Sequence, residues 1–266
     1  MKRDDVLIKK VTYLLKRVGA PTHLNKYGPK KYSLAEKVYA LFLRSEWKAS
    51  FRRTKQLCND VGISCPSKST LHYILNKIPW NFIKNMLNVT ITKQTSLAAI
   101  DGTGLSRNRL SQHYILRAGI DVKKHKPSKL SILVDTSNKK ILSARFRKNL
   151  AHDIKDVKYL INHSPQKPNK IVADKGYDAE WFREFLALQG IGFCIPTKGK
   201  VVHGFYRKRN KCDQRTYRRR PMVESSFFRL KQLFGHSVSC VKARNMRAEV
   251  FIRIILYNLS LGFWMI

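Results

Sequence analysis

The sequence is short of acidic residues. Its 266 residues include 17 Asp and Glu against 53 Lys and Arg, which gives a formal net charge of +36 and a pI near 10.4. A compact chain with this charge repels itself unless a polyanion neutralises it, and nucleic acid is the commonest such partner. A membrane surface and a charged surface that binds nothing are the alternatives.

Long hydrophobic runs are also missing. The most apolar stretch, residues 250–266, is 17 residues long and contains Arg253, so it is short for a membrane span and predicts a core helix that closes the fold. The first ten residues, MKRDDVLIKK, lack the apolar segment of a secretory signal. We therefore expect a cytoplasmic protein without a membrane partner.

Cysteine is scarce and widely spaced. The five residues include no close pair of the zinc-ribbon type, so the spacing predicts reduced, mostly buried thiols. They are Cys58, Cys65, Cys194, Cys212 and Cys240.

Apolar residues are plentiful enough for a core. At 43% hydrophobic and 11% aromatic, the composition excludes a disordered basic tail and allows one large domain or two modest ones. The most basic stretch, 198–220, holds ten Lys and Arg and a single acid, Asp213. It predicts a segment that follows a nucleic-acid backbone, with a solvated loop as the alternative.

The first third of the chain has helical periodicity. Apolar residues between positions 33 and 78 fall into three amphipathic segments, which predict a small bundle within a basic N-terminal domain, residues 1–94. Around Cys58 and Gly62 the pattern is typical of the first helix and turn of a helix-turn-helix. The connection to the next helix is about three residues longer than the tight motif, so an ordinary packing bundle is the alternative. The expected groove-facing residues are Ser67, Lys68, Thr70 and His72.

After Thr95 the pattern changes to strands. Expected strands at 97–100, 114–116, 130–134 and 141–146 form an antiparallel meander, followed by helix 153–161, strand 170–173, helix 178–188 and strand 191–195. A run of strands followed by alternation predicts an α/β domain over residues 95–266, with a mixed sheet flanked by helices.

Two acids have positions that suit chemistry. Asp101 and Asp174 each come at the end of an apolar strand and precede a glycine-containing turn, through Gly102 and Gly176. If the two strands are neighbours, their carboxylates face each other and favour a divalent cation between them. Taken singly, each is more often a turn-forming Asp.

A third acid follows the basic stretch. Pro221 suits the first position of a helix whose apolar ridge is formed by Val223, Phe227, Leu230 and Phe234. At 100° per residue, Glu224 and Lys231 share a stripe beside this ridge, and Arg220 falls on the same stripe if the path is extended backwards. An exposed Glu that pairs with nearby arginines is the alternative.

These residues resemble the DDE transposases of prokaryotic insertion sequences, in the four-type and five-type group. The resemblance covers residues 97–263, and its most specific part is the Tyr-Arg-Glu-Lys spacing of Tyr217, Arg220, Glu224 and Lys231. It also includes the pair His152-Asp153 and the closing run 257–259.

The resemblance implies an RNase H-like catalytic domain in which Asp101, Asp174 and Glu224 hold two Mg²⁺ ions, with Mn²⁺ as a substitute. It implies that Tyr217, Arg220 and Lys231 contact DNA near the scissile phosphate. The activity would be cut-and-paste transposition, in which the enzyme acts on the element's terminal inverted repeats and on target DNA. A homodimer in the synaptic complex and a nucleoid-associated location in a prokaryotic cytoplasm are expected.

Three other functions are compatible with parts of the sequence. An RNase H-like nuclease would release DNA ends without joining them. A transposase-derived DNA-binding protein would bind without cutting, although all three acids are retained. An RNA-binding structural protein would satisfy the charge but would not need the acids.

Overall fold

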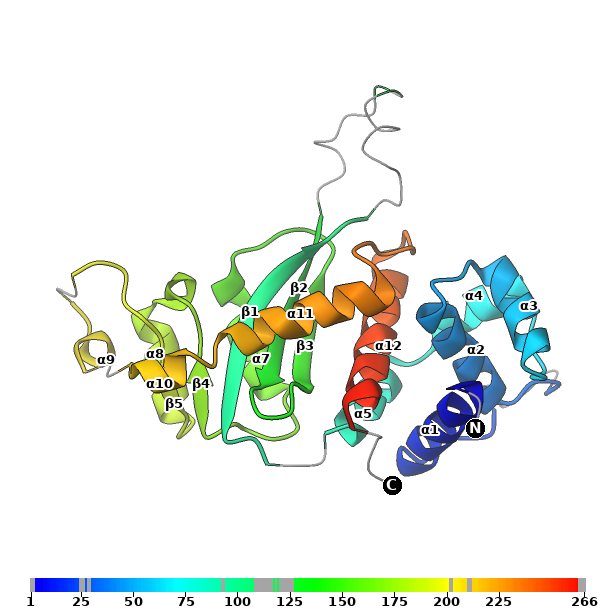
Figure 1. Cartoon of the computed structure of the whole chain (residues 1–266), viewed down its shortest axis with the longest axis horizontal. Helices are drawn as coiled ribbons and strands as arrows, with labels where there is room; N and C mark the ends of the chain where they lie inside the picture. Colours follow the sequence, from blue (N-terminus) through cyan, green and yellow to red (C-terminus); the bar gives the residue numbers. More distant parts are fainter. Residues whose placement is uncertain are drawn as a thin grey trace. The chain divides into compact units, whose positions relative to one another are not determined.

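The computed structural model describes residues 3–262, except 24–26, 28–29, 92–93, 108–116, 118, 120–126, 201–202 and 210–211. The chain forms two compact units (Figure 1). One contains residues 1–90 together with 232–266, and the other contains residues 91–231. A role of residues 1–94 as a DNA-binding domain stays a prediction, because packing units do not define functional domains.

The first unit is helical. Its elements are α1 (Arg3–Arg17), α2 (Leu34–Glu46), α3 (Phe51–Asp60), α4 (Lys68–Lys77), α5 (Trp80–Val89) and α12 (Ala243–Gly262). Serine side chains cap three of the helix starts, because a hydroxyl satisfies a backbone N–H that has no partner within the helix. Ser33 forms a capping box with Glu36 before α2, and Ser50 and Ser67 cap α3 and α4.

Helices α3 and α4 lie where the sequence predicts them. Gly62 follows α3 with φ of 71°, in the left-handed region that glycine adopts without strain. The sequence predicts Leu71, Ile74, Leu75 and Ile78 as the apolar face of the third segment; the first three are the buried side chains of α4, and Ile78 caps its end.

The closing helix α12 confirms the predicted core helix. Almost every residue from Asn245 to Leu259 is buried, and the helix packs against α2 and α5. The buried Arg253 is neutralised by Glu249, one turn earlier on the same helix. None of the helices in the described part of the chain is long and apolar enough to span a membrane.

The second unit is built on a mixed five-stranded sheet in the order β3-β2-β1-β4-β5. The strands are β1 (Leu97–Leu105), β2 (Ser128–Asp135), β3 (Ile141–Arg147), β4 (Lys170–Val172) and β5 (Gly192–Cys194). β1, β2 and β3 pair antiparallel, whereas β4 pairs parallel with both β1 and β5. The predicted α/β architecture with a mixed sheet is confirmed.

One strand differs from its prediction. We expected the first strand to end at Asp101 in a turn, but β1 continues to Leu105 because its far half pairs with β2. On its other side β4 ends at Val172, so Asp101 lies where one neighbouring strand stops and the other continues. The expected strand at 114–116 lies outside the described residues.

Helices cover both faces of this sheet. Between the strands lie η2 (Asp153–Asp156), α7 (Val157–Asn162), η3 (Lys175–Tyr177) and α8 (Glu180–Leu188), and after them come α9 (Phe205–Lys208), α10 (Gln214–Tyr217) and α11 (Pro221–Phe234). Side chains of α7 and α8 join Ala98 and Ile100 of β1 in one buried cluster. In Figure 1, α7 lies behind the sheet and α11 crosses in front of it. Because strand side chains alternate, Asp101 points to the face opposite Ile100.

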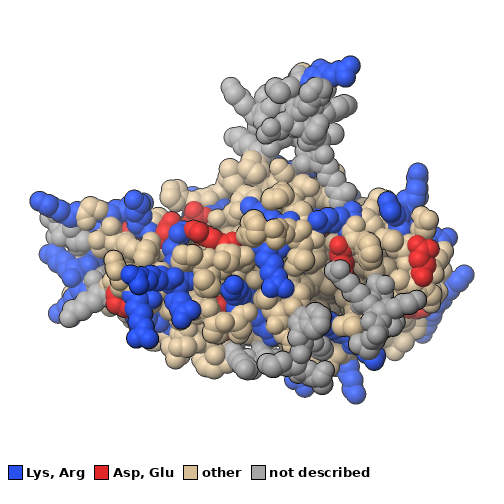
Figure 2. All heavy atoms as spheres, in the orientation of Figure 1, with Lys and Arg blue, Asp and Glu red and all other residues tan. Residues whose placement is uncertain are grey.

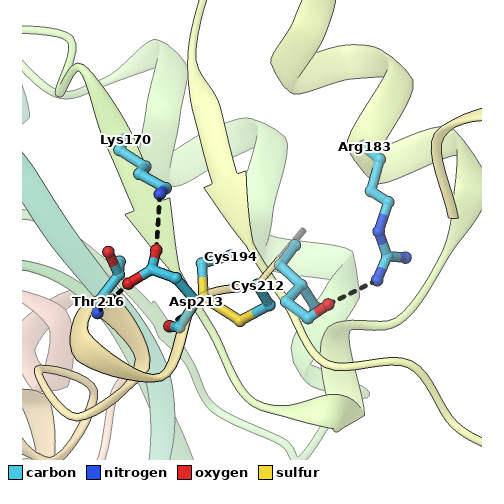
Figure 3. The surroundings of a disulfide bond; sticks show 7 residues. Lys170, Arg183, Cys194, Cys212, Asp213 and Thr216 are labelled. Atoms are coloured by element: carbon cyan, nitrogen blue, oxygen red, sulfur yellow. Dashed lines mark hydrogen bonds and ion pairs between the residues drawn. A yellow bond between two sulfur atoms is a disulfide. The ribbon is translucent and has the colours of Figure 1, made fainter. Parts of the chain in front are cut away.

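The prediction that all cysteines are reduced is wrong. Cys194 and Cys212 form a disulfide across 18 positions of sequence, with their Cα atoms 4.4 Å apart (Figure 3). The chain between them carries α9 and returns to the end of β5, a proximity that sequence spacing does not reveal. Cys58 and Cys65 are free and buried as predicted, and Cys240 is free and half-buried.

Candidate active site

Asp101 and Asp174 meet through the pairing of parallel strands. Ala98 and Ala99 of β1 pair with Ile171 and Val172 of β4. Continued by two residues, this register places Asp174 opposite Asp101. The predicted convergence of the two strands is therefore observed.

The two carboxylates are held in the same way. Oδ1 of Asp101 accepts the N–H of Gly102 at 2.8 Å, and Oδ1 of Asp174 accepts the N–H of Gly176 at 2.7 Å. In both residues Oδ2 faces the guanidinium of Arg220, at 3.3 Å from Asp101 and 3.8 Å from Asp174. Each carboxylate thus has one oxygen fixed by backbone and one directed into a shared space.

Glu224 brings the third carboxylate to the same guanidinium. It lies in the first turn of α11, and its Oε1 is 2.7 Å from Nη1 of Arg220. The predicted apolar ridge orients this helix, because Val223, Phe227 and Leu230 are all buried. Three acids distant in sequence therefore surround one cation.

Exposure differs among the three acids. The side chains of Asp101, Asp174 and Glu224 are 17%, 36% and 53% exposed. Burial raises the pKa of Asp101, and the negative charges of Asp174 and Asp153 add to this rise. The Gly102 N–H and the Arg220 guanidinium oppose it without cancelling it.

A fourth acid lies beside the three, and our site prediction did not include it. The carboxylate of Asp153 packs against Gly102, where a Cβ would overlap with it. Nζ of the buried Lys129 pairs with Asp153 at 2.8 Å and with the buried Asp156 at 3.7 Å. The signals in the sequence were the pair His152-Asp153 before a helix and the glycine directly after Asp101.

Tyr177 lies under this acidic group. It is 1% exposed, and its hydroxyl has no hydrogen-bond partner among the described residues. Burial raises its pKa far above the usual range, and the charges of Asp153, Asp101 and Asp174 contribute to the rise. Tyr177 therefore stays a neutral phenol.

Lys231 continues the site along α11. Its Nζ donates to Oγ1 of Thr103 at 2.6 Å, and Thr103 lies two residues beyond Asp101 on β1. Burial lowers the pKa of Lys231. The lysine is thus held on the same strand as the first acid.

None of the contacts of the three acids described above involves the other predicted residues. Tyr217 ends α10 and lines a separate cavity of about 620 Å³. Ser67, Lys68, Thr70 and His72 belong to the other compact unit. Ser67 and Thr70 hydrogen-bond to each other at the start of α4, whereas Lys68 and His72 are exposed.

Basic side chains surround the acids. Figure 2 shows Lys and Arg scattered over this face, with few acidic patches, the most extended of which lies near the start of α11. A small acidic site inside a basic surface attracts a polyanion to the carboxylates.

The donor set suits a divalent cation. Carboxylate oxygens are the ligands that Mg²⁺ and Mn²⁺ prefer, and here three of them already point at one positive charge. Within the described part of the chain, no three acidic, His or Cys side chains stand close enough together to hold a metal directly. The oxygens surround a guanidinium instead.

Comparison with solved structures finds transposase complexes among the matches. A piggyBac transposase synaptic complex with hairpin DNA matches 95% of this chain and 71% of that chain, with 10% identity and a TM-score of 0.50. A Mos1 transposase paired-end complex with left transposon end matches 93% and 84%, with 13% identity and a TM-score of 0.27. The first match confirms the RNase H-like fold. Comparison with curated protein sequences finds no match.

The family is established by sequence. The model of the transposase DDE domain matches residues 92–259, which is more than half of the chain and includes Asp101, Asp174 and Glu224. With its mixed sheet and its three converging acids, this chain belongs to the DDE transposases, the enzymes that cut and join DNA.

Proposed function

We propose that this transposase uses Asp101, Asp174 and Glu224 as its catalytic acids in cut-and-paste transposition. The observation that carries the proposal is the convergence of all three carboxylates on one guanidinium, at 2.7–3.8 Å. A structural role for each acid would not require them to share a cation.

DDE transposases use divalent metal ions. Bound as a pair, two Mg²⁺ or Mn²⁺ ions would activate the attacking oxygen and stabilise the leaving oxygen of a phosphodiester. Asp101 would hold both ions, and Asp174 and Glu224 would hold one each. The backbone bonds to Oδ1 of the two aspartates fix the direction of the oxygens that face the site.

The basic residues of the site suit DNA. Arg220 offers a planar fork for a phosphate, and Lys231 offers a point charge that Thr103 holds beside β1. Tyr217 lines its cavity together with the basic residues Arg207 and Lys208, and the family resemblance implies that it contacts DNA near the scissile phosphate. A water would attack first at the element end, and the freed 3′-OH would then attack target DNA.

The test replaces each acid without changing its size. Asp101→Asn, Asp174→Asn and Glu224→Gln should each reduce metal-dependent cleavage of element ends at least about 10³-fold. DNA binding should be retained or stronger, because repulsion of phosphate is reduced. The matched control is Glu184→Gln, which removes an exposed acid on α8.

Retained cleavage in any one variant would remove that residue from the site. A strand-transfer assay with the wild-type protein separates a transposase from a nuclease of the same fold, because a nuclease releases ends without joining them. No cleavage by the wild-type protein would instead favour a DNA-binding protein derived from a transposase.

We also propose that the N-terminal helices read the terminal inverted repeats through Ser67, Lys68, Thr70 and His72. We propose in addition that two subunits bring two element ends together.

A fragment starting near Thr95 cannot test this proposal, because it lacks the helices against which α12 packs. His72→Ala in the full chain should weaken discrimination of the repeat by about 1–3 kcal/mol. Lys77→Ala, at the other end of α4, is the control, and equal selectivity of wild type and His72→Ala would contradict the assignment.

A further inference from the structure

Arg220 occupies the position between the three carboxylates. Its Nη2 is 3.3 Å from Asp101 and 3.8 Å from Asp174, and its Nη1 is 2.7 Å from Glu224. Three carboxylates around one point repel one another, and a single guanidinium relieves part of this repulsion. Arg220 is therefore the counter-ion that the three acids share.

The position of Arg220 does not satisfy all of its donors. Its Nε is buried and has no hydrogen-bond partner among the described residues. An unpaired donor on a buried group costs free energy, and the Asp174 contact is longer than a hydrogen bond. Attraction between opposite charges therefore holds the side chain more than well-formed hydrogen bonds do.

The contacts are also weak enough to be exchanged. The Arg220 side chain is 21% exposed and that of Glu224 is 53% exposed, and ion pairs open to solvent contribute little. Arg220 lies in the turn between α10 and α11, outside both helices. The backbone of this turn is held by a bond from the Arg220 N–H to the Tyr217 carbonyl.

We propose that Arg220 is a displaceable counter-ion of the active site. It assembles the carboxylates before divalent ions bind, competes with those ions for the same oxygens, and moves to a DNA phosphate when the ions replace it. The inference rests on the proposed function, because it takes the same three acids as metal ligands. It adds that one residue serves first the carboxylates and then the DNA backbone.

Charge explains why the Arg220 guanidinium and the divalent ions exclude each other. The guanidinium carries one positive charge and lies on the carboxylate oxygens that the ions need, so both cannot occupy the space together. Two divalent ions bring more charge than the three acids carry, so a guanidinium left between them would be repelled. The backbone phosphate is the nearest anion that a DNA substrate supplies, and its shape matches the fork of arginine.

The test measures metal binding without DNA. Calorimetric titration of the full chain with MnCl₂ in a phosphate-free buffer should give Arg220→Gln a dissociation constant roughly tenfold lower than that of the wild type. Arg220→Lys keeps the charge but loses the fork, so it should fall between them. Arg219→Ala, an exposed neighbour in the same turn, should match the wild type.

The melting temperature is a second readout, which stays informative if the variant is less stable. Without Arg220 the acids repel each other, so the melting temperature of Arg220→Gln in EDTA should be lower than that of the wild type. Added Mn²⁺ should then raise the melting temperature of this variant more than that of the wild type, because tighter binding to the folded state stabilises it more.

The outcomes separate this inference from the proposed function. Wild-type Mn²⁺ binding that Asp101→Asn abolishes supports the metal site, and unchanged or weaker binding in Arg220→Gln would then overturn the counter-ion role alone. If the wild type binds no Mn²⁺ that depends on Asp101, the metal site is absent and both proposals fail.

Discussion

Asp101 on β1 and Asp174, two residues beyond the end of the parallel neighbour β4, each fix one carboxylate oxygen on a glycine N–H while the other oxygen faces Arg220. The relation depends on β4 ending at Val172 while β1 continues to Leu105. Because backbone N–H groups fix the orientation of both carboxylates, substitutions nearby can change the charge of the site or the space beside it without moving the strands.

Lys231→Ala should weaken binding to DNA and lower the slope of log affinity against log salt by about one ion. The reason is that Lys231 is expected to neutralise one phosphate. Thr103→Val is the matched variant, because it removes the acceptor of the 2.6 Å bond but leaves the charge. It should reduce affinity with the slope unchanged. A Lys231→Ala protein with the wild-type salt slope would show that this lysine does not bind phosphate.

Gly102→Ala should lower the free energy of unfolding by about 1–2 kcal/mol, because the new Cβ overlaps with the Asp153 carboxylate and crowds Lys129. Gly104→Ala on the same strand meets only Pro127, at 3.7 Å, and should change stability by less than about 0.5 kcal/mol. Urea unfolding measures both. In the double variant Gly102→Ala/Asp153→Ala the two effects should not add, since the overlap is gone; full additivity would mean that the two residues do not touch.

Thiol counting tests the disulfide. Unfolded without reductant, the protein should react with three equivalents of a thiol reagent, and after reduction with five, because Cys194 and Cys212 are paired. The folded protein should react slowly at pH 8. Burial raises the pKa of Cys240 to about 12 and also raises those of the buried Cys58 and Cys65, so little thiolate forms. Five reactive thiols before reduction would show that the pair is open.

Asp101→Asn should raise the melting temperature at pH 7 relative to the wild type. The pKa of Asp101 is raised in the folded state, so stability falls as the pH rises from the unfolded pKa to the folded pKa, and the full cost is present above the folded pKa. Below the pKa of an unfolded Asp both proteins are neutral at this position, so the difference in stability should shrink as the pH falls towards 4. Differential scanning calorimetry from pH 4 to 7 follows it. A difference that grows on acidification would contradict the sign of the shift.

Much of the site could be predicted from the sequence, for reasons that are local. The spacing from Arg220 to Lys231 fixes one face of a helix because the α-helical period is constant, and the buried Val223, Phe227 and Leu230 confirm that face. The two aspartates stand out because each comes at the end of an apolar strand with a glycine close behind it. None of these patterns could state that the carboxylates would share Arg220.

The sequence by itself determined most of the elements, the basic character of the chain and the family, because periodicity, charge and motif spacing are properties of neighbouring residues. Only the tertiary structure decided the Cys194–Cys212 bond, the length of β1, the place of Asp153 against Gly102 and the guanidinium between the three acids. Each of these depends on contacts between segments far apart in the chain, and such contacts are set by strand pairing and packing, which no local pattern encodes.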